Sequence, residues 1–144
     1  MEIHDSLGYL LNTSARMIKR KMDACLEKYT ITTSQWAVLK LLDTKEVLTQ
    51  AQVAEGLRGD RATMGSVIQR LQEKKLIDKV LDTKDRRAYL VCLTPVAKEM
   101  IKDIEKMAQD VFAEALKGFE ESDIEVLYRS IRRIIANLSE EENV

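Results

Sequence analysis

The densest group of charged side chains occupies one short segment of the chain. Of the six residues from Asp82 to Arg87, five are charged: Asp82, Lys84, Asp85, Arg86 and Arg87. The run "AYLVCLT" follows, with alternating apolar residues, and it ends at Thr94 and Pro95. Strand signals on both sides of a short polar segment predict a β-hairpin, so we expect this segment to be its turn. A fixed turn of this charge could bind an anionic partner.

The three cations of the turn suit phosphate groups or a minor groove of DNA, whose negative potential attracts basic side chains. The two acids, Asp82 and Asp85, seem to oppose such a partner. A carboxylate can nevertheless orient a guanidinium or ammonium group by hydrogen bonding, which lowers the entropy lost on binding. We therefore predict a basic tip braced by its acids. The alternative is a solvated loop with weak surface ion pairs.

A second group of polar side chains precedes the turn. Asp60 can cap a helix over "RATMGSVIQRLQEKKL", in which Met64, Val67, Ile68 and Leu71 share one face. The other face carries donors of the kinds that bind base edges and phosphates: Arg61, Thr63, Ser66, Gln69 and Arg70.

The "RGD" segment at residues 58–60 joins this helix to a shorter one, which Thr49 and Gln52 start with a capping box. Two short helices joined by a turn that contains glycine form the helix-turn-helix pattern. The spacing thus predicts a helix-turn-helix followed by a hairpin over residues 76–82 and 88–94.

The flanking segments are helical. Apolar residues from Ile3 to Tyr29 recur at steps of three and four, which predicts one long amphipathic helix. A capping box of Thr32 and Gln35 predicts a second helix that ends near Asp43. Thr94 and Pro95 then start a helix that runs to about Lys117, where Gly118 ends it.

A capping box of Ser122 and Glu125 predicts the last helix. Its apolar seam needs a partner helix, and the preceding helix offers a stripe of its own. The seam consists of Ile124, Leu127, Ile131, Ile134 and Leu138, and the stripe of Val96, Met100, Ile104, Met107, Val111 and Ala115.

Composition agrees with a helical globular protein. The 144 residues suit one domain, and the chain has one Pro and five Gly, 33% charged residues and 45% hydrophobic ones. Residues 58–97 hold nine Lys and Arg against five Asp and Glu, whereas residues 98–144 hold seven against twelve. A basic middle in a chain of net charge −1 favours a local anionic partner. No apolar run approaches the roughly 20 residues that span a bilayer, so we expect a cytoplasmic protein.

Catalytic and metal sites are disfavoured. The sequence has no glycine-rich phosphate loop and no nucleophile elbow, and His4 is its single histidine. Cys25 and Cys92 lie far apart in unlike contexts, and such cysteines are usually small buried hydrophobes. We expect neither an enzyme nor a cofactor.

The order of elements and four segments resemble the MarR family of winged-helix repressors over nearly the whole chain. These segments are "TSQWAVLKLL", "TQAQVAEGL", "RATMGSVIQRLQEKKLI" and "DTKDRRAYLVCLTPVAKEM". The family pattern in the wing is Asp-x-Arg-Asp-x-Arg, then a strand and Leu-Thr-x-x-Gly; the matching positions here are Asp82, Lys84, Asp85, Arg87, Leu93, Thr94 and Ala97. Lys84 replaces the arginine that enters the minor groove, and it keeps the charge but loses the flat guanidinium fork. Ala97 replaces the glycine.

The resemblance implies a mainly α fold with a small β-hairpin wing. Residues 31–94 would be the winged helix-turn-helix, and residues 1–30 and 95–144 a helical dimerisation region. A homodimer would repress transcription from a pseudo-palindromic operator in double-stranded DNA, with half-sites about 34 to 36 Å apart. The alternative is a protein interaction module whose winged domain binds an acidic partner.

The resemblance also implies release from DNA by a small aromatic or lipophilic anion. By position, this pocket would be lined by Arg16, Lys19, Trp36 and Arg86. Trp36 could instead be a core residue, since large aromatic side chains are usually buried. A redox-sensing branch of the family carries a cysteine early in the first helix, and "GYLLNTSAR" has none.

Overall fold

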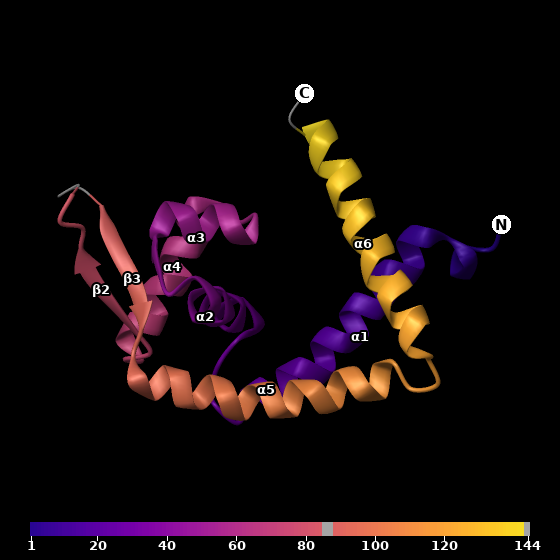
Figure 1. Cartoon of the computed structure of the whole chain (residues 1–144), viewed down its shortest axis with the longest axis horizontal. Helices are drawn as coiled ribbons and strands as arrows, with labels where there is room; N and C mark the ends of the chain where they lie inside the picture. Colours follow the sequence, from indigo (N-terminus) through magenta and orange to yellow (C-terminus); the bar gives the residue numbers. More distant parts are fainter. Residues whose placement is uncertain (85–87, 143–144) are drawn as a thin grey trace. The chain divides into compact units, whose positions relative to one another are not determined.

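The computed structural model describes residues 1–84 and 88–142, with side chains as far as Ser139. The expected fold, mainly helical with a small β wing, is confirmed (Figure 1). The chain forms two compact units, Met1–Val111 and Phe112–Val144. The elements in chain order are η1 (Ile3–Asp5), α1 (Leu7–Glu27), α2 (Thr33–Lys45), β1 (Val47–Thr49), α3 (Gln50–Leu57), α4 (Arg61–Glu73), β2 (Ile77–Leu81), β3 (Tyr89–Leu93), α5 (Pro95–Ala115) and α6 (Glu121–Glu142).

Four of the expected helix caps are present. The Thr32 and Thr49 hydroxyls accept from the backbone N–H groups of Gln35 and Gln52. The side chains of these two glutamines accept in turn from the N–H groups of Thr32 and Thr49, so both capping boxes are complete. The Asp60 carboxylate caps α4. At the start of α5, the Ala97 N–H donates to Thr94 Oγ1 at 3.2 Å. These helix starts depend on residues three positions apart, so the sequence alone predicts them.

Two helix starts differ from the expected ones. The first helix begins at Leu7 and not at Ile3, because Ser6 is extended and its hydroxyl accepts from the Tyr9 N–H at 3.3 Å. Ser122 does not cap the last helix. Helix α6 begins at Glu121, since the Glu120 carbonyl already accepts from the N–H groups three and four residues further on, at Asp123 and Ile124.

The sheet has three antiparallel strands in the order β1, β3, β2. The hairpin of β2 and β3 is the expected one, with Ile77 paired to Leu93 and Leu81 paired to Tyr89. Strand β1 was not expected from the sequence. Its three residues are too few to show an alternating pattern, and its partner in β3 lies more than forty residues away, where Val47 pairs with Cys92.

One apolar core holds the winged domain together. It joins the end of α1 to α2, α3, α4, the sheet and α5, with Leu26, Val38, Leu39, Ile68 and Ile101 almost fully buried. A smaller cluster of Met22, Ala108 and Val111 links α1 to α5. The end of the first helix is therefore part of the same compact unit as the wing.

The buried stripe of α5 differs from the expected one. Val96 is 68% exposed, and Ala115 is exposed as well. Ile104 and Val111 are buried as expected, and Met100 and Met107 pack against the core, whereas Ala97, Ile101 and Ala108 are buried in place of Val96 and Ala115. They pack in the core of the winged domain and against α1, because the small Ala97 and Ala108 side chains allow the helix to approach closely. This stripe is not a free partner for another helix.

Candidate nucleic-acid interface

Helix α4 is fixed by its apolar face and by the turn before it. Met64, Ile68 and Leu71 are buried. A Cβ atom at Gly59 would lie 3.1 Å from Met64 Cγ, so a larger residue at position 59 would require the Met64 side chain to shift. The left-handed conformation of the turn belongs to Arg58, with φ of 55°, and not to the glycine. Gly59 thus leaves room for the Met64 side chain, and the turn does not require a positive φ at this glycine.

The five donors expected on the other face of α4 are all exposed. Within the residues that the structure describes, no hydrogen bond or ion pair engages the side chains of Arg61, Ser66, Gln69 or Arg70. Thr63 differs, because its N–H and its hydroxyl both donate to the Asp60 carboxylate. Those bonds hold the pKa of Asp60 below its usual value, the hydroxyl bond contributing most. The face combines free donors with a well-fixed first turn.

The wing is closed by hydrogen bonds of Asp82. Its N–H donates to the Ala88 carbonyl at 2.9 Å, and its Oδ1 accepts from the Lys84 N–H at 2.9 Å. Asp82 therefore braces the main chain under Lys84, and its expected role in orienting a charged side chain of the turn stays a prediction. Asp85, Arg86 and Arg87 lie outside the described residues.

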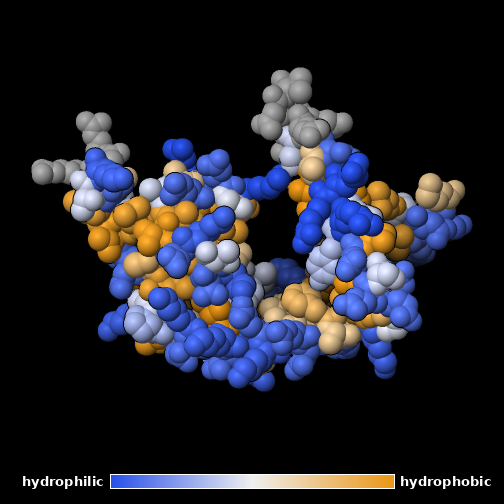
Figure 2. Space-filling model, in the orientation of Figure 1, coloured by the Kyte–Doolittle hydropathy of each residue, from blue (hydrophilic) through white to orange (hydrophobic). Residues whose placement is uncertain are grey.

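Apolar side chains are exposed on the wing next to its turn, where Leu81 pairs with Tyr89. Val80, Leu81 and Tyr89 are between 45% and 53% exposed, and hydrophobic residues lie at the surface in this region, at the left of Figure 2. The Lys79 ammonium group lies 4.8 Å from the centre of the Tyr89 ring. This cation–π contact places a positive charge beside the strands that lead to the turn.

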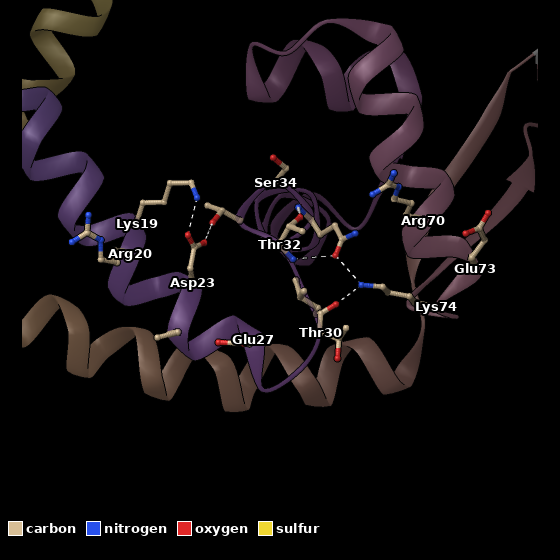
Figure 3. A pocket seen from close by; sticks show the side chains of 14 residues that line it. Lys19, Arg20, Asp23, Glu27, Thr30, Thr32, Ser34, Arg70, Glu73 and Lys74 are labelled. Carbon is tan, nitrogen blue, oxygen red and sulfur yellow. Dashed lines mark hydrogen bonds and ion pairs between the residues drawn. The ribbon is translucent and has the colours of Figure 1, made fainter.

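An open cavity of about 980 Å³ lies where the N-terminal end of α2 meets α1 and the end of α4 (Figure 3). Lys19 contributes to its wall. Arg16 and Trp36 are not among the lining residues, and Arg86 lies outside the described part of the chain. The lining residues are Lys19, Arg20, Asp23, Ala24, Glu27, Thr30, Ile31, Thr32, Thr33, Ser34, Gln35, Arg70, Glu73 and Lys74.

Trp36 is half-buried and packs against both core clusters. The Lys40 ammonium group lies 5.9 Å from the centre of its ring and forms an ion pair with Glu105. Arg16 and Trp36 thus do not line this cavity, and the expected effector pocket of Arg16, Lys19, Trp36 and Arg86 stays a prediction. Arg20 and Lys74 also line the cavity, and neither was expected from the sequence. The capping box of Thr32 and Gln35 marks only the end of α2 that lies beside them.

The remaining reactive side chains are dispersed. Cys25 and Cys92 are free thiols, both partly buried, and Cys25 packs against the small cluster of α1 and α5. Among residues 1–84 and 88–142, no group of three His, Cys, Asp or Glu side chains could hold a metal ion. In the same part of the chain, no helix is long and apolar enough to cross a membrane.

The sequence is similar to that of known transcription regulators. A sequence model described as MarR family matches residues 29–88. The organic hydroperoxide resistance transcriptional regulator of Bacillus subtilis is 31% identical over 107 residues, which are 72% of this chain and 73% of that protein.

Two solved structures share the fold. Mutant MarR from E. coli complexed with operator DNA has a TM-score of 0.84 at 20% identity, over 93% of this chain and 99% of that one. BpsR from Bordetella bronchiseptica, whose DNA binding is regulated by 6-hydroxynicotinic acid, has a TM-score of 0.84 at 22% identity, over 93% and 96%.

The chain belongs to the MarR family. It is a winged helix-turn-helix transcription regulator that binds DNA, and the family consists of regulators rather than enzymes. The resemblance found in the sequence is confirmed.

Proposed function

We propose that the protein is a homodimeric, cytoplasmic repressor that binds a pseudo-palindromic operator in double-stranded DNA. The exposed face of α4 carries the proposal, because the side chains of Arg61, Ser66, Gln69 and Arg70 have no partner among the described residues and the opposite face of the helix is buried. Arg61, Ser66, Gln69 and Arg70 would contact base edges and phosphates in the major groove. Lys84, with Arg86 and Arg87, would contact the neighbouring phosphates and minor groove, and Thr63 would hold the first turn of α4 in place.

The exposed apolar surface of α6 supports a homodimer. Ile124, Leu127, Ile131 and Ile134 are only partly buried, and Leu138 is 58% exposed. None of residues 121–139 is buried within the chain. Removing such a seam from water favours association, since apolar surface contributes roughly 25 cal/mol per Å² buried. A second copy offers the same seam, and in a symmetric dimer each chain would present one α4 to one half-site.

Regulation by a small organic anion is the remaining part of the proposal. BpsR shows this behaviour on the same fold. In the present chain, Arg16 and Lys19 are exposed cations of α1, and Lys19 lies beside the start of α2, so both have suitable chemistry for an anion. A ligand can lower operator affinity only if it binds the DNA-free form more tightly than the DNA-bound form.

Selection from random duplex DNA tests the function directly. We expect enrichment of a short inverted repeat whose half-site centres are about one helical turn apart. Enrichment of a single half-site would support DNA recognition but contradict the dimer. No enrichment, with weak binding that depends steeply on salt, would contradict sequence-specific binding and favour a protein partner for the winged domain.

A further inference from the structure

The C-terminal end of α4 is joined to the start of α2 by one lysine. Lys74 is the C-cap residue of α4, and its ammonium group donates to Gln35 Oε1 at 3.1 Å and to the Thr30 carbonyl. Gln35 belongs to the first turn of α2, and Thr30 lies in the loop between α1 and α2. Figure 3 shows Lys74 reaching from α4 to Thr30. One side chain therefore ties α4 to two acceptors that lie 39 and 44 residues earlier in the chain.

The two acceptors of Lys74 are fixed by their own surroundings. Gln35 is 3% exposed, and its Oε1 also accepts from the Thr32 N–H at 3.1 Å in the capping box of α2. Thr30 has a φ of 56°, which is uncommon for a residue other than glycine and rarer still for a β-branched one. Such a conformation persists only where the surrounding structure determines it. The two acceptors therefore restrict where the Lys74 ammonium group can lie.

The first turn of α2 is also held from the α1 side. The Asp23 carboxylate of α1 accepts from the Lys19 ammonium group at 2.8 Å and from the Thr33 hydroxyl. These bonds hold the pKa of Asp23 below its usual value, the Lys19 bond contributing most, so the carboxylate is ionised at neutral pH. The start of α2 is thus fixed to α1, and Lys74 joins the end of α4 to this fixed turn.

Apolar packing alone leaves α4 some freedom, which this lysine removes. The buried residues Met64, Ile68 and Leu71 form one stripe along the helix. Apolar contacts are not directional, so a helix that packs through one stripe can still roll about its axis. A hydrogen bond requires a defined distance and angle. The contacts of Lys74 lie beyond the last buried residue of the stripe, and they therefore determine how the exposed face of α4 is turned.

We propose that Lys74 is a positioning residue for sequence recognition, which fixes the orientation of α4 through Gln35 and Thr30 without contacting DNA itself. A base contact requires a donor such as Gln69 within hydrogen-bond distance of one base edge, whereas contacts to phosphate carry no sequence information. Loss of Lys74 should therefore weaken binding to the operator more than binding to other DNA. This consequence rests on the proposed function, whereas the anchoring of α4 does not.

Amide hydrogen exchange of the full-length protein without DNA tests the anchoring. Lys74→Met keeps an unbranched side chain but removes the three N–H donors. We expect exchange in the last turn of α4 to become faster by about tenfold or more, which corresponds to about 1.4 kcal/mol, and exchange in β2 and β3 to stay the same. If exchange in the last turn of α4 is unchanged, the proposal is overturned.

The next residue in the chain supplies the matched control. Lys75 is exposed, and its side chain has no hydrogen bond or ion pair among the described residues. Lys75→Met removes the same charge from the same end of α4, so it should exchange like the parent protein. Equal exchange in Lys74→Met and Lys75→Met would overturn the proposal. Urea unfolding establishes that each variant is folded under the conditions of the measurement.

Operator binding tests the consequence for recognition. Lys74→Met should bind the selected operator about tenfold more weakly than Lys75→Met, and the two variants should bind a scrambled duplex alike. Lys74→Arg should restore operator affinity, since a guanidinium group can also donate to two acceptors. An equal loss for the operator and the scrambled duplex would assign Lys74 to a phosphate contact and overturn the proposal. An arginine variant as weak as the methionine variant would overturn it as well.

The measurement without DNA separates this inference from the proposed function. Faster exchange in Lys74→Met, in a protein that selects no DNA sequence, would support the anchoring of α4 and contradict the proposed function. Faster exchange with operator affinity equal to that of Lys75→Met would leave the proposed function intact. It would show that recognition does not depend on this anchor, and the proposed role of Lys74 would be overturned.

Discussion

The side chains on the exposed face of α4 and in the wing have different roles under the proposed function. Gln69 can read a base edge in the major groove, since an amide can both donate to and accept from adenine. Lys84 stands where the wing turns and can contact only phosphate or the floor of a minor groove. Base contacts confer specificity, and phosphate contacts confer affinity that depends on salt.

Substitution of these two residues should separate the roles. Gln69→Ala should weaken binding to the selected operator by about 1–3 kcal/mol and relax the preference at one base position. Lys84→Ala should weaken binding to all duplexes alike and lower the slope of log affinity against log salt by about one. Fluorescence anisotropy at several salt concentrations measures both effects. If the two variants behave alike, the assignment of roles is wrong.

The Asp60 carboxylate caps α4, so protonation of this group should weaken the start of the helix. Because its pKa is lowered in the folded protein, the ionised cap stabilises the fold above the unfolded-state value of about 3.9. This stabilisation should be lost as the pH falls below that value through the lower folded-state pKa. Asp60→Asn keeps a good capping group but cannot ionise.

We therefore expect the parent protein and Asp60→Asn to differ more in free energy of unfolding at pH 7 than at pH 3. Urea unfolding at both values measures the difference, and Asp23 titrates in both proteins, so its contribution cancels. A difference that stays constant between the two pH values would mean that the ionised carboxylate does not stabilise α4.

At the scale of the element, α4 depends on its buried face. Ile68 is 1% exposed in the centre of the core, so Ile68→Ala should lower the free energy of unfolding by about 2–5 kcal/mol. Gln72→Ala, on the exposed face of the same helix, should change it by less than about 0.5 kcal/mol. Urea unfolding monitored by circular dichroism checks both. Equal effects would show that the helix is not anchored through this face.

Local signals in the sequence were sufficient to predict most helices and strands, and the exposed donors on α4. The capping residues Thr32, Thr49, Asp60 and Thr94 each start a helix, because a cap needs only its own side chain and the next few N–H groups. Strand β1, and the choice of which α5 residues are buried, depend on residues far away in the chain. Val47 becomes a strand residue only when it pairs with Cys92, and no local pattern contains that pairing.

The cavity could not be predicted from the sequence for the same reason. Arg20 and Arg70 are fifty residues apart, and each looks like an ordinary solvated residue of an amphipathic helix. Only the packing of α1 and α4 around the start of α2 makes them walls of one cavity. The resemblance to the MarR family pointed to Arg16 and Trp36 instead, and the structure places both outside this cavity.

At the scale of the whole molecule, the proposed dimer should depend on the seam of α6. Ile134→Glu places a charge in the seam, and burial of an unpaired charge is costly, so we expect a monomer in sedimentation experiments at micromolar concentration. Ala136→Glu, an exposed position on the opposite side of the helix, should remain a dimer. Ile134→Glu should also lose most of its operator affinity, since a single half-site remains. A dimer that survives Ile134→Glu would place the interface elsewhere.

The central claim is that the protein recognises a DNA sequence as a dimer through α4 and the wing. Its most direct test is the affinity for the selected inverted repeat, for one isolated half-site and for a scrambled duplex, each at 50 and about 200 mM salt. We expect a dissociation constant of about 10⁻⁸ M or tighter for the repeat, and binding weaker by about 10³-fold or more for the scrambled duplex. Equal affinity for the repeat and the scrambled duplex would contradict the claim.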